Sequence, residues 1–320
     1  MKQLTAYVAA SEFKTQLQQE ILLDTELKLV KEIDNVFLVQ GPCKPLVWSQ
    51  NQWLNPVICN YSSIKDAQNI LRNAAKHWHL SAASLNRRAL LIQEGLPKWK
   101  IKTQAPYQPI STIPLASYAV ISNNEMIYSS ECQWPYPDGK IPFAEDHLQP
   151  PSRAYLKLWE VFTRLGVKPT SNDLCIDLGA CPGGWTWVLT ELGAHVISVD
   201  RSPLDEKLMA NPLVNFTKKD AFQMTPDKFP NTTPTWILSD LICYPSKLLE
   251  FIHEWLQSGT KANFICTIKF QGHTDFAITK KFLEIPGSTA FHLWANKHEV
   301  TWALIQNNGH EKKCPSARTK

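Results

Sequence analysis

The stretch from Leu174 to Trp185, LCIDLGACPGGW, decides the fold of this chain of 320 residues. It begins with the apolar run 174–178, which is predicted to be a strand, and continues through a turn rich in glycine. A helix is predicted over 184–192 and a second strand over 195–200. A strand, a glycine turn, a helix and a strand in this order are typical of a Rossmann-like half-fold, in which a ligand binds at the turn. The sequence therefore predicts an α/β domain here.

The alternation of helices and strands continues on both sides of this stretch. The patterns predict a helix over 155–165, strands over 235–238, 263–268 and 298–305, and a helix over 246–256. Strands that alternate with helices indicate a parallel sheet covered by helices. We expect this domain to span 151–306 and to be followed by a polar tail, 307–320.

The N-terminal half has shorter and weaker patterns. Strands are predicted over 6–10 and 36–39, and an amphipathic helix over 11–23. A clearer helix, 63–78, begins at Ser63, which has capping-box spacing to Asp66. We expect a smaller α+β domain over 1–104. Prolines and turn pairs crowd residues 105–150, which we interpret as a connecting segment.

Composition excludes several classes of protein. Hydrophobic residues make up 44% of the chain, enough for a substantial core. No apolar run approaches the roughly 18 residues of a membrane span, and the first residues lack the apolar stretch of a secretory signal. We therefore expect a cytoplasmic protein without a membrane segment. The eight cysteines include no C-x-x-C pair, so we expect reduced, packed thiols and no metal site.

The glycine turn is a candidate cofactor site. A nicotinamide-binding turn reads G-x-G-x-x-G, but Cys181 takes the place of the second glycine, where the backbone must approach a pyrophosphate closely. S-adenosylmethionine has no phosphate and needs only a cradle for its amino acid part, so it fits better. Asp200 is placed for the two ribose hydroxyls and Asp220, one strand later, for the adenine amino group. Either aspartate alone would more often be a helix cap, but their joint placement after successive strands favours binding. The predicted cofactor residues are Gly179, Ala180, Cys181, Pro182, Gly183, Gly184, Trp185, Asp200, Asp220 and Asp240.

Four further residues are not required by the fold alone: Lys157, Asp240, Lys269 and Glu299. Asp240 and Lys269 each follow an apolar strand, and the carboxyl ends of parallel strands meet at the ligand crevice. A single lysine is usually a solvated side chain, and a single aspartate is often a helix cap. A lysine that directly follows five mostly apolar strand residues is harder to explain in this way. We interpret the four residues as a candidate catalytic group.

In these motifs the chain resembles the FtsJ-like RNA ribose 2′-O-methyltransferases. The resemblance covers about 150–303 and rests on PSRAYLKL at 151–158, the DLGACPGGW turn, Asp240, Lys269 and the EVT triplet at 299–301. It implies S-adenosylmethionine as cofactor, RNA as partner and a cytidine of large-subunit ribosomal RNA as substrate. It also implies that the four residues are the family's Lys-Asp-Lys-Glu tetrad, with Lys269 as the base, and that the N-terminal domain is a ferredoxin-like or THUMP-like RNA-binding module.

The tetrad is chemically suited to this reaction. The methyl carbon of a sulfonium is already electrophilic, so the enzyme must align a ribose oxygen with it and remove a proton. A lysine accepts a proton only when it is neutral, a form that partial burial and the positive charge of Lys157 favour. Asp240 would orient Lys269 and the hydroxyl, and Glu299 would hold Lys157 or the ribose.

Two other classes of methyltransferase lack their motifs in this chain. An amino-methyltransferase needs Asn or Asp followed by Pro-Pro and an aromatic residue after the fourth strand, and a cytosine C5 enzyme needs a Pro-Cys nucleophile there. The chain has SDLICYP at 239–245, where no proline precedes Cys243, which we interpret as a packing residue. Two alternatives stay open: a 2′-O-methyltransferase for another RNA, and an inactive RNA-binding protein on the same fold.

A basic stretch between residues 72 and 102 is the best candidate for RNA binding. It carries seven lysines and arginines against the single Glu94, and such cations contact phosphates. We predict that Arg72, Lys76, Arg87 and Arg88 bind RNA. Trp78 and Trp99 could stack on unpaired bases, but core packing is the favoured interpretation of both.

Overall fold

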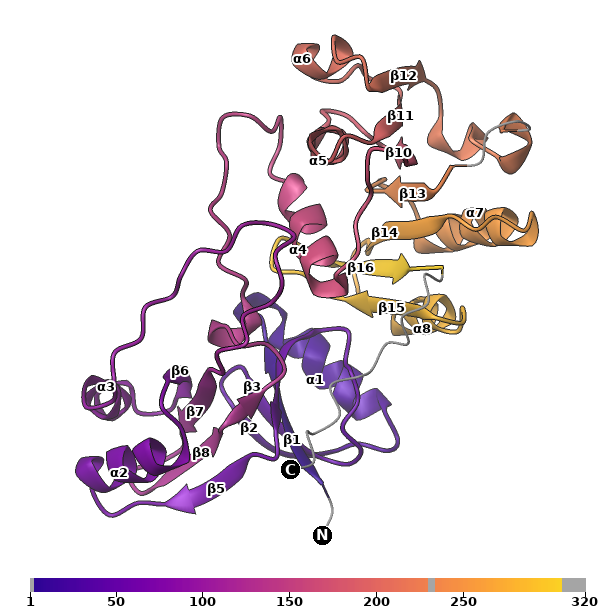
Figure 1. Cartoon of the computed structure of the whole chain (residues 1–320). Helices are drawn as coiled ribbons and strands as arrows, with labels where there is room; N and C mark the ends of the chain where they lie inside the picture. The colour runs from indigo at the N-terminus through magenta and orange to yellow at the C-terminus, as the bar shows by residue number, and fades with distance from the viewer. Residues whose placement is uncertain (1–2, 230–233, 307–320) are drawn as a thin grey trace. The chain divides into compact units, whose positions relative to one another are not determined.

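The computed structural model describes residues 3–229 and 234–306 (Figure 1). The chain divides between Ala144 and Glu145 into two compact units. The predicted polar tail, 307–320, lies outside the described residues. None of the helices formed by the described residues is long and apolar enough to cross a membrane.

The C-terminal unit is built on a seven-stranded sheet with the order β12-β11-β10-β13-β14-β16-β15. The first five strands in this order are parallel, and β16 is antiparallel to both β14 and β15. The strands are β10 (Leu174–Leu178), β11 (His195–Asp200), β12 (Val214–Lys218), β13 (Trp236–Ser239), β14 (Asn263–Lys269), β15 (Ser288–Phe291) and β16 (Glu299–Leu304). This confirms the predicted Rossmann-like α/β fold.

Burial on both faces explains why the central strands are mostly apolar. Strands β13 and β16 are buried at every position, as strands inside a sheet covered on both faces should be. The helices are α4 (Tyr155–Leu165), α5 (Gly184–Glu191), α6 (Glu206–Met209), α7 (Pro245–Gln257) and α8 (Phe276–Leu283). Helix α5 packs against α4, β10 and β11, and α7 packs against β14 and α8. Helix α4 ends at Gly166, whose φ of 70° suits the left-handed C-cap that glycine favours.

The N-terminal unit contains two sheets. The first has the order β2-β3-β1-β4-β9 and is antiparallel throughout. Its elements are β1 (Leu4–Ala9), α1 (Lys14–Leu23), β2 (Lys28–Ile33), β3 (Val36–Gln40), β4 (Ser49–Leu54) and β9 (Glu131–Cys132). The order β1-α1-β2-β3 opens the ferredoxin-like β-α-β-β-α-β pattern. The second helix of that pattern is absent, because residues 41–48, between β3 and β4, form neither helix nor strand.

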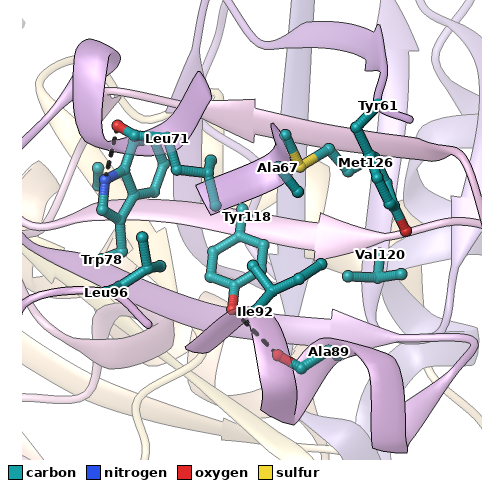
Figure 2. Close-up of a cluster of buried hydrophobic side chains, with 11 residues drawn as sticks. Tyr61, Ala67, Leu71, Trp78, Ala89, Ile92, Leu96, Tyr118, Val120 and Met126 are labelled. Carbon is teal, nitrogen blue, oxygen red and sulfur yellow. Dashed lines mark hydrogen bonds between the residues drawn. The ribbon is translucent and has the colours of Figure 1, made fainter. Parts of the chain in front are cut away.

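The second sheet has the order β5-β8-β7-β6 and is accompanied by two helices. Its elements are β5 (Val57–Asn60), α2 (Ile64–Ala74), β6 (Trp78–Ala83), α3 (Asn86–Glu94), β7 (Ala116–Val120) and β8 (Glu125–Ser129). Helix α2 begins as predicted, since the Ser63 hydroxyl accepts from the Asp66 amide at 3.2 Å. Figure 2 shows the core between these elements, where the Trp78 indole donates to the Leu71 carbonyl and the Tyr118 hydroxyl to that of Ala89. Trp78 is therefore a core residue.

Residues 105–150 do more than connect the two halves. They contain β7, β8 and β9, which complete both sheets of the N-terminal unit. Three prolines of this segment, at 106, 109 and 114, precede the buried run that begins at Leu115, and the other four, at 135, 137, 142 and 150, follow β9. Proline removes a backbone donor only at its own position, so a strand can begin directly after it. The N-terminal unit accordingly reaches Ala144 rather than residue 104.

Candidate active site

The carboxyl ends of β10, β11 and β13 border two adjoining cavities. One, of about 370 Å³, is lined by the glycine turn together with Asp240 and Lys269. The other, of about 350 Å³, is lined by residues after β11 and β12, including Arg201, Asp220 and Phe222. Gly179, Asp200, Leu241 and Ile242 line both. In sheets of this type, ligands bind outside the carboxyl ends of the strands. The two cavities therefore lie where the sequence predicts a ligand site.

The glycines of the turn have conformations or neighbours that exclude a side chain. Gly183 has a φ of 117°, and a Cβ there would lie 2.3 Å from Cδ1 of Leu208. A Cβ on Gly184 would lie 2.4 Å from the Ser152 hydroxyl. A larger residue would therefore require Leu208 or Ser152 to move, and at Gly183 it would also strain the backbone.

The two predicted aspartates are held by backbone amides beside these cavities. Asp200 accepts from the Cys181 amide at 3.0 Å and from the Ser202 amide at 2.9 Å, which ties the end of β11 to the glycine turn. Asp220 accepts from the Phe222 amide at 3.0 Å and pairs with Arg201. The amide of Phe222 and the guanidinium of Arg201 together lower the pKa of Asp220. Both side chains are therefore held in fixed positions beside the cavities.

The four candidate catalytic residues, which the sequence places on four different elements, lie together. The Lys157 ammonium contacts both carboxylate oxygens of Asp240, at 3.0 and 3.1 Å, and Oε1 of Glu299 at 2.6 Å. Nζ of Lys269 donates to the backbone carbonyl of Asp240 at 2.7 Å and lies 3.1 Å from Oδ1 of the same residue. Asp240 thus joins the two lysines.

Strand register places Glu299 opposite Lys269. The two residues are directly paired across the antiparallel ladder of β14 and β16. Side chains of opposed residues in such a ladder project from the same face of the sheet. The antiparallel position of β16 therefore brings a carboxylate from the end of the chain to the site formed by the parallel strands.

Lys157 is buried, and its charge is balanced. Burial disfavours its charged form, but the carboxylates of Asp240 and Glu299 outweigh burial and raise the pKa of Lys157. One turn further along α4, Glu160 accepts from the Trp294 amide at 3.0 Å and pairs with Arg164 at 2.7 Å. These contacts hold α4, which carries Lys157, against the segment that leads into β16.

Comparison with known proteins agrees with this geometry. Residues 150–285 match the FtsJ-like methyltransferase family and thus form a domain of this kind. Three members of the candidate tetrad lie within the match, whereas Glu299 follows it.

Curated relatives of the FtsJ-like domain carry a more specific name. The chain is 37% identical to ribosomal RNA large subunit methyltransferase M of Shewanella woodyi over 191 residues, which are 54% of this chain and 52% of the relative. It is 30% identical to the protein of the same name from Halorhodospira halophila over 174 residues, 52% of this chain and 50% of the relative. The chain thus spans about half the length of these relatives.

Among solved structures, TrmN from Thermus thermophilus is similar at a TM-score of 0.35 and 12% identity, over 95% of this chain and 99% of that one. This likeness is too low to bear on function.

FtsJ-like methyltransferases use S-adenosylmethionine, and the residues here fit it. The turn from Gly179 to Trp185 leaves the floor of the first cavity free of side chains at its glycines, and Asp200 and Asp220 line the second. The first cavity would take the amino acid part of the cofactor and the second its adenosine. When bound, the cofactor supplies an electrophilic methyl group.

One residue of the FtsJ-like domain was not singled out from the sequence. Asp177, inside β10, is buried, lines the first cavity and accepts from the Thr186 hydroxyl at 2.7 Å. Burial raises its pKa to about 7, although the bond from Thr186 lowers it. The sequence signal that could have identified Asp177 is an acidic residue inside the otherwise apolar run 174–178.

The predicted RNA-binding residues belong to the N-terminal unit. Arg87 and Lys76 are exposed. Arg72 donates to the Gly95 carbonyl at the end of α3. Arg88 donates to the Tyr61 hydroxyl at 3.1 Å, and its guanidinium lies 5.3 Å from the centre of that ring. Arg72 and Arg88 thus have structural partners, whereas Arg87 is exposed. Arg87 and Arg88 both line a cavity of about 470 Å³.

Proposed function

We propose that this chain methylates a ribose 2′-hydroxyl in RNA and that its substrate is large-subunit ribosomal RNA. The observation that carries the proposal is the position of Lys269. Its amine contacts two oxygens of Asp240, at 2.7 and 3.1 Å, and lines the cavity bordered by the glycine turn.

These two oxygens can orient the amine of Lys269. A neutral amine has two N–H donors and one lone pair, and the two oxygens of Asp240 can take both donors. The lone pair of Lys269 Nζ is then available to a hydroxyl in the cavity, which is the geometry that a general base requires. Asp240 therefore orients the amine, and Lys269 Nζ receives the proton of the 2′-hydroxyl.

Lys157 and Glu299 support this arrangement. Lys157 binds both carboxylate oxygens of Asp240, so the side chain of Asp240 cannot rotate without breaking a buried ion pair. Glu299 contacts the same ammonium at 2.6 Å, so a second carboxylate holds Lys157 in place. Together they fix Asp240, which in turn positions Lys269.

The identity of the RNA is supported by the relatives and by the second unit. Both relatives described above are named for large-subunit ribosomal RNA, and we extend this substrate, at a cytidine, to the present chain. The N-terminal unit carries the basic residues that would contact phosphates. A different RNA is the alternative substrate. An inactive RNA-binding protein is the alternative function, but such a protein would not require the buried ion pairs of the tetrad.

The test is to treat ribosomal RNA from cells that lack this protein with the purified chain and labelled S-adenosylmethionine. We expect one ribose methyl group in the large-subunit RNA, identified by mass spectrometry and by resistance of the adjacent phosphodiester to alkali. Lys269→Ala should give none. A methyl group on a base would overturn the 2′-hydroxyl assignment, and methylation of transfer RNA alone would replace the substrate.

A further inference from the structure

The loop after Asp240 exposes two large side chains to solvent. Ile242 is 85% exposed and Tyr244 is 65% exposed. Both line the second cavity, and Ile242 also lines the first, together with Asp240 and Lys269. Exposed apolar side chains beside a reaction site are a common sign of a contact surface.

Local structure does not explain the tyrosine. Tyr244 is the N-cap of α7, a position where Ser, Thr, Asp or Asn would satisfy a free amide. Its side chain forms no capping hydrogen bond, and Pro245 follows at the first position of the helix. A residue that departs from local sequence preferences and makes no compensating structural contact is often retained for function.

The surroundings of this loop carry positive charge. Lys247 lies 4.0 Å from the centre of the Phe222 ring, and it lines the second cavity with Arg201 and Lys219. Of the two carboxylates in that cavity, Asp220 is paired with Arg201 and Asp200 is bound by two backbone amides. Aromatic and apolar side chains surrounded by cations are the composition of surfaces that bind unpaired nucleotides.

We propose that Ile242 and Tyr244 hold an unpaired base of the RNA beside the ribose that is methylated, with Tyr244 stacked on the base and Ile242 packed against its edge. This rests on the proposed function, since it takes RNA as the substrate. The proposal adds a requirement on the RNA: the base must be unpaired, because a base that is paired in a helix cannot stack on Tyr244. The loop therefore selects a nucleotide in a single-stranded segment.

The test compares Tyr244→Ala, Tyr244→Phe and Ile242→Ala by three measurements: the KM for ribosomal RNA, kcat, and the Kd for S-adenosylmethionine. Base stacking on an aromatic side chain is lost in Tyr244→Ala, so we expect its KM to rise about tenfold or more. Tyr244→Phe keeps the ring and should restore the wild-type KM. Because both residues line the cavity assigned to adenosine, the Kd for the cofactor is measured in each variant and the KM for RNA is determined at saturating cofactor. Leu283→Ala is the control, since Leu283 is exposed in α8 and lines neither cavity.

A second measurement does not depend on methyl transfer. A single-stranded oligoribonucleotide that contains 2-aminopurine should lose fluorescence on binding to the wild-type chain and to Tyr244→Phe, and keep it with Tyr244→Ala. If no RNA is methylated but this quenching is seen, the proposed function fails and the binding surface stands. A loss of cofactor affinity in Tyr244→Ala, with RNA binding intact, would assign the ring to the adenosine pocket and overturn the proposal. Unchanged values throughout would also overturn it.

Discussion

Lys269 contacts two oxygens of a single residue, and this makes its replacement by arginine informative. Arginine keeps the positive charge and most of the length, but it cannot lose its proton at accessible pH. We expect Lys269→Arg and Lys269→Ala each to lower the rate of methyl transfer by about 10²–10⁴-fold, with cofactor binding intact. Single-turnover methylation measures this, with Lys280→Arg as a control on an exposed lysine of the same unit. A Lys269→Arg variant with most of the wild-type rate would refute the role of Lys269 as base.

Asp177 should make folding stability depend on pH. Its pKa rises from 3.8 to about 7 on folding, so between these values the folded chain keeps a proton that the unfolded chain has lost. The contribution of this group is complete below pH 4 and falls as pH rises through 7, by a few kcal/mol at most. Asp177→Asn removes this dependence. Urea unfolding at pH 5 and pH 8 should show a larger decline for wild type than for the variant, and equal declines would contradict the assignment.

At the scale of elements, Gly183 in the glycine turn can be compared with Gly259, a glycine of similar backbone conformation outside the turn. Gly183 and Gly259 both have positive φ, 117° and 80°, but a Cβ on Gly183 meets Leu208 at 2.3 Å and one on Gly259 meets nothing within 4 Å. Alanine at either position should cost about 1 kcal/mol of stability because of backbone strain. Only Gly183→Ala should also weaken binding of S-adenosylmethionine, measured by calorimetry. Equal affinities in the two variants would show that the turn does not shape the cofactor pocket.

The longer elements of the C-terminal unit could be predicted from the sequence to within a residue or two. The bounds predicted for α4, β10 and β11 are those observed, because each has a continuous or strongly periodic apolar pattern. Helices α6 and α8 and strand β15 were not predicted. Helix α6 and strand β15 are each only four residues long, and the hydrophobic pattern of so short a segment does not distinguish a helix from a strand.

That the four candidate residues lie together could be expected from the sequence, but most of their contacts could not. The charged residues of the tetrad stand out because they interrupt or end apolar runs. Three features could not be predicted, since each depends on tertiary structure: the pairing of Lys157 with Asp240, the burial of Asp177 and the exposure of Ile242. No sequence pattern reports how much of a loop residue faces solvent.

For the whole molecule, a variant of Arg87 can test whether the N-terminal unit binds RNA while the C-terminal unit binds the cofactor. Its side chain is exposed, whereas Arg88 contacts Tyr61, so charge reversal at Arg87 perturbs the fold less. We expect Arg87→Glu to weaken RNA binding and to make its logarithmic salt dependence less steep, because fewer counterions are released. The affinity for S-adenosylmethionine should not change. Binding titrations at several salt concentrations decide this, and an unchanged slope would place Arg87 outside the RNA path.

Strand β16 enters the sheet between β14 and β15, although it follows both in the sequence. During synthesis, one edge of β14 therefore stays without a partner until residues 299–304 have left the ribosome. An unpaired strand edge readily pairs with other chains, and partly made sheets aggregate for this reason. A chain interrupted at residue 285, where the family match ends, would keep three members of the tetrad and still expose this edge. We expect the cell to contain either the finished chain or insoluble fragments.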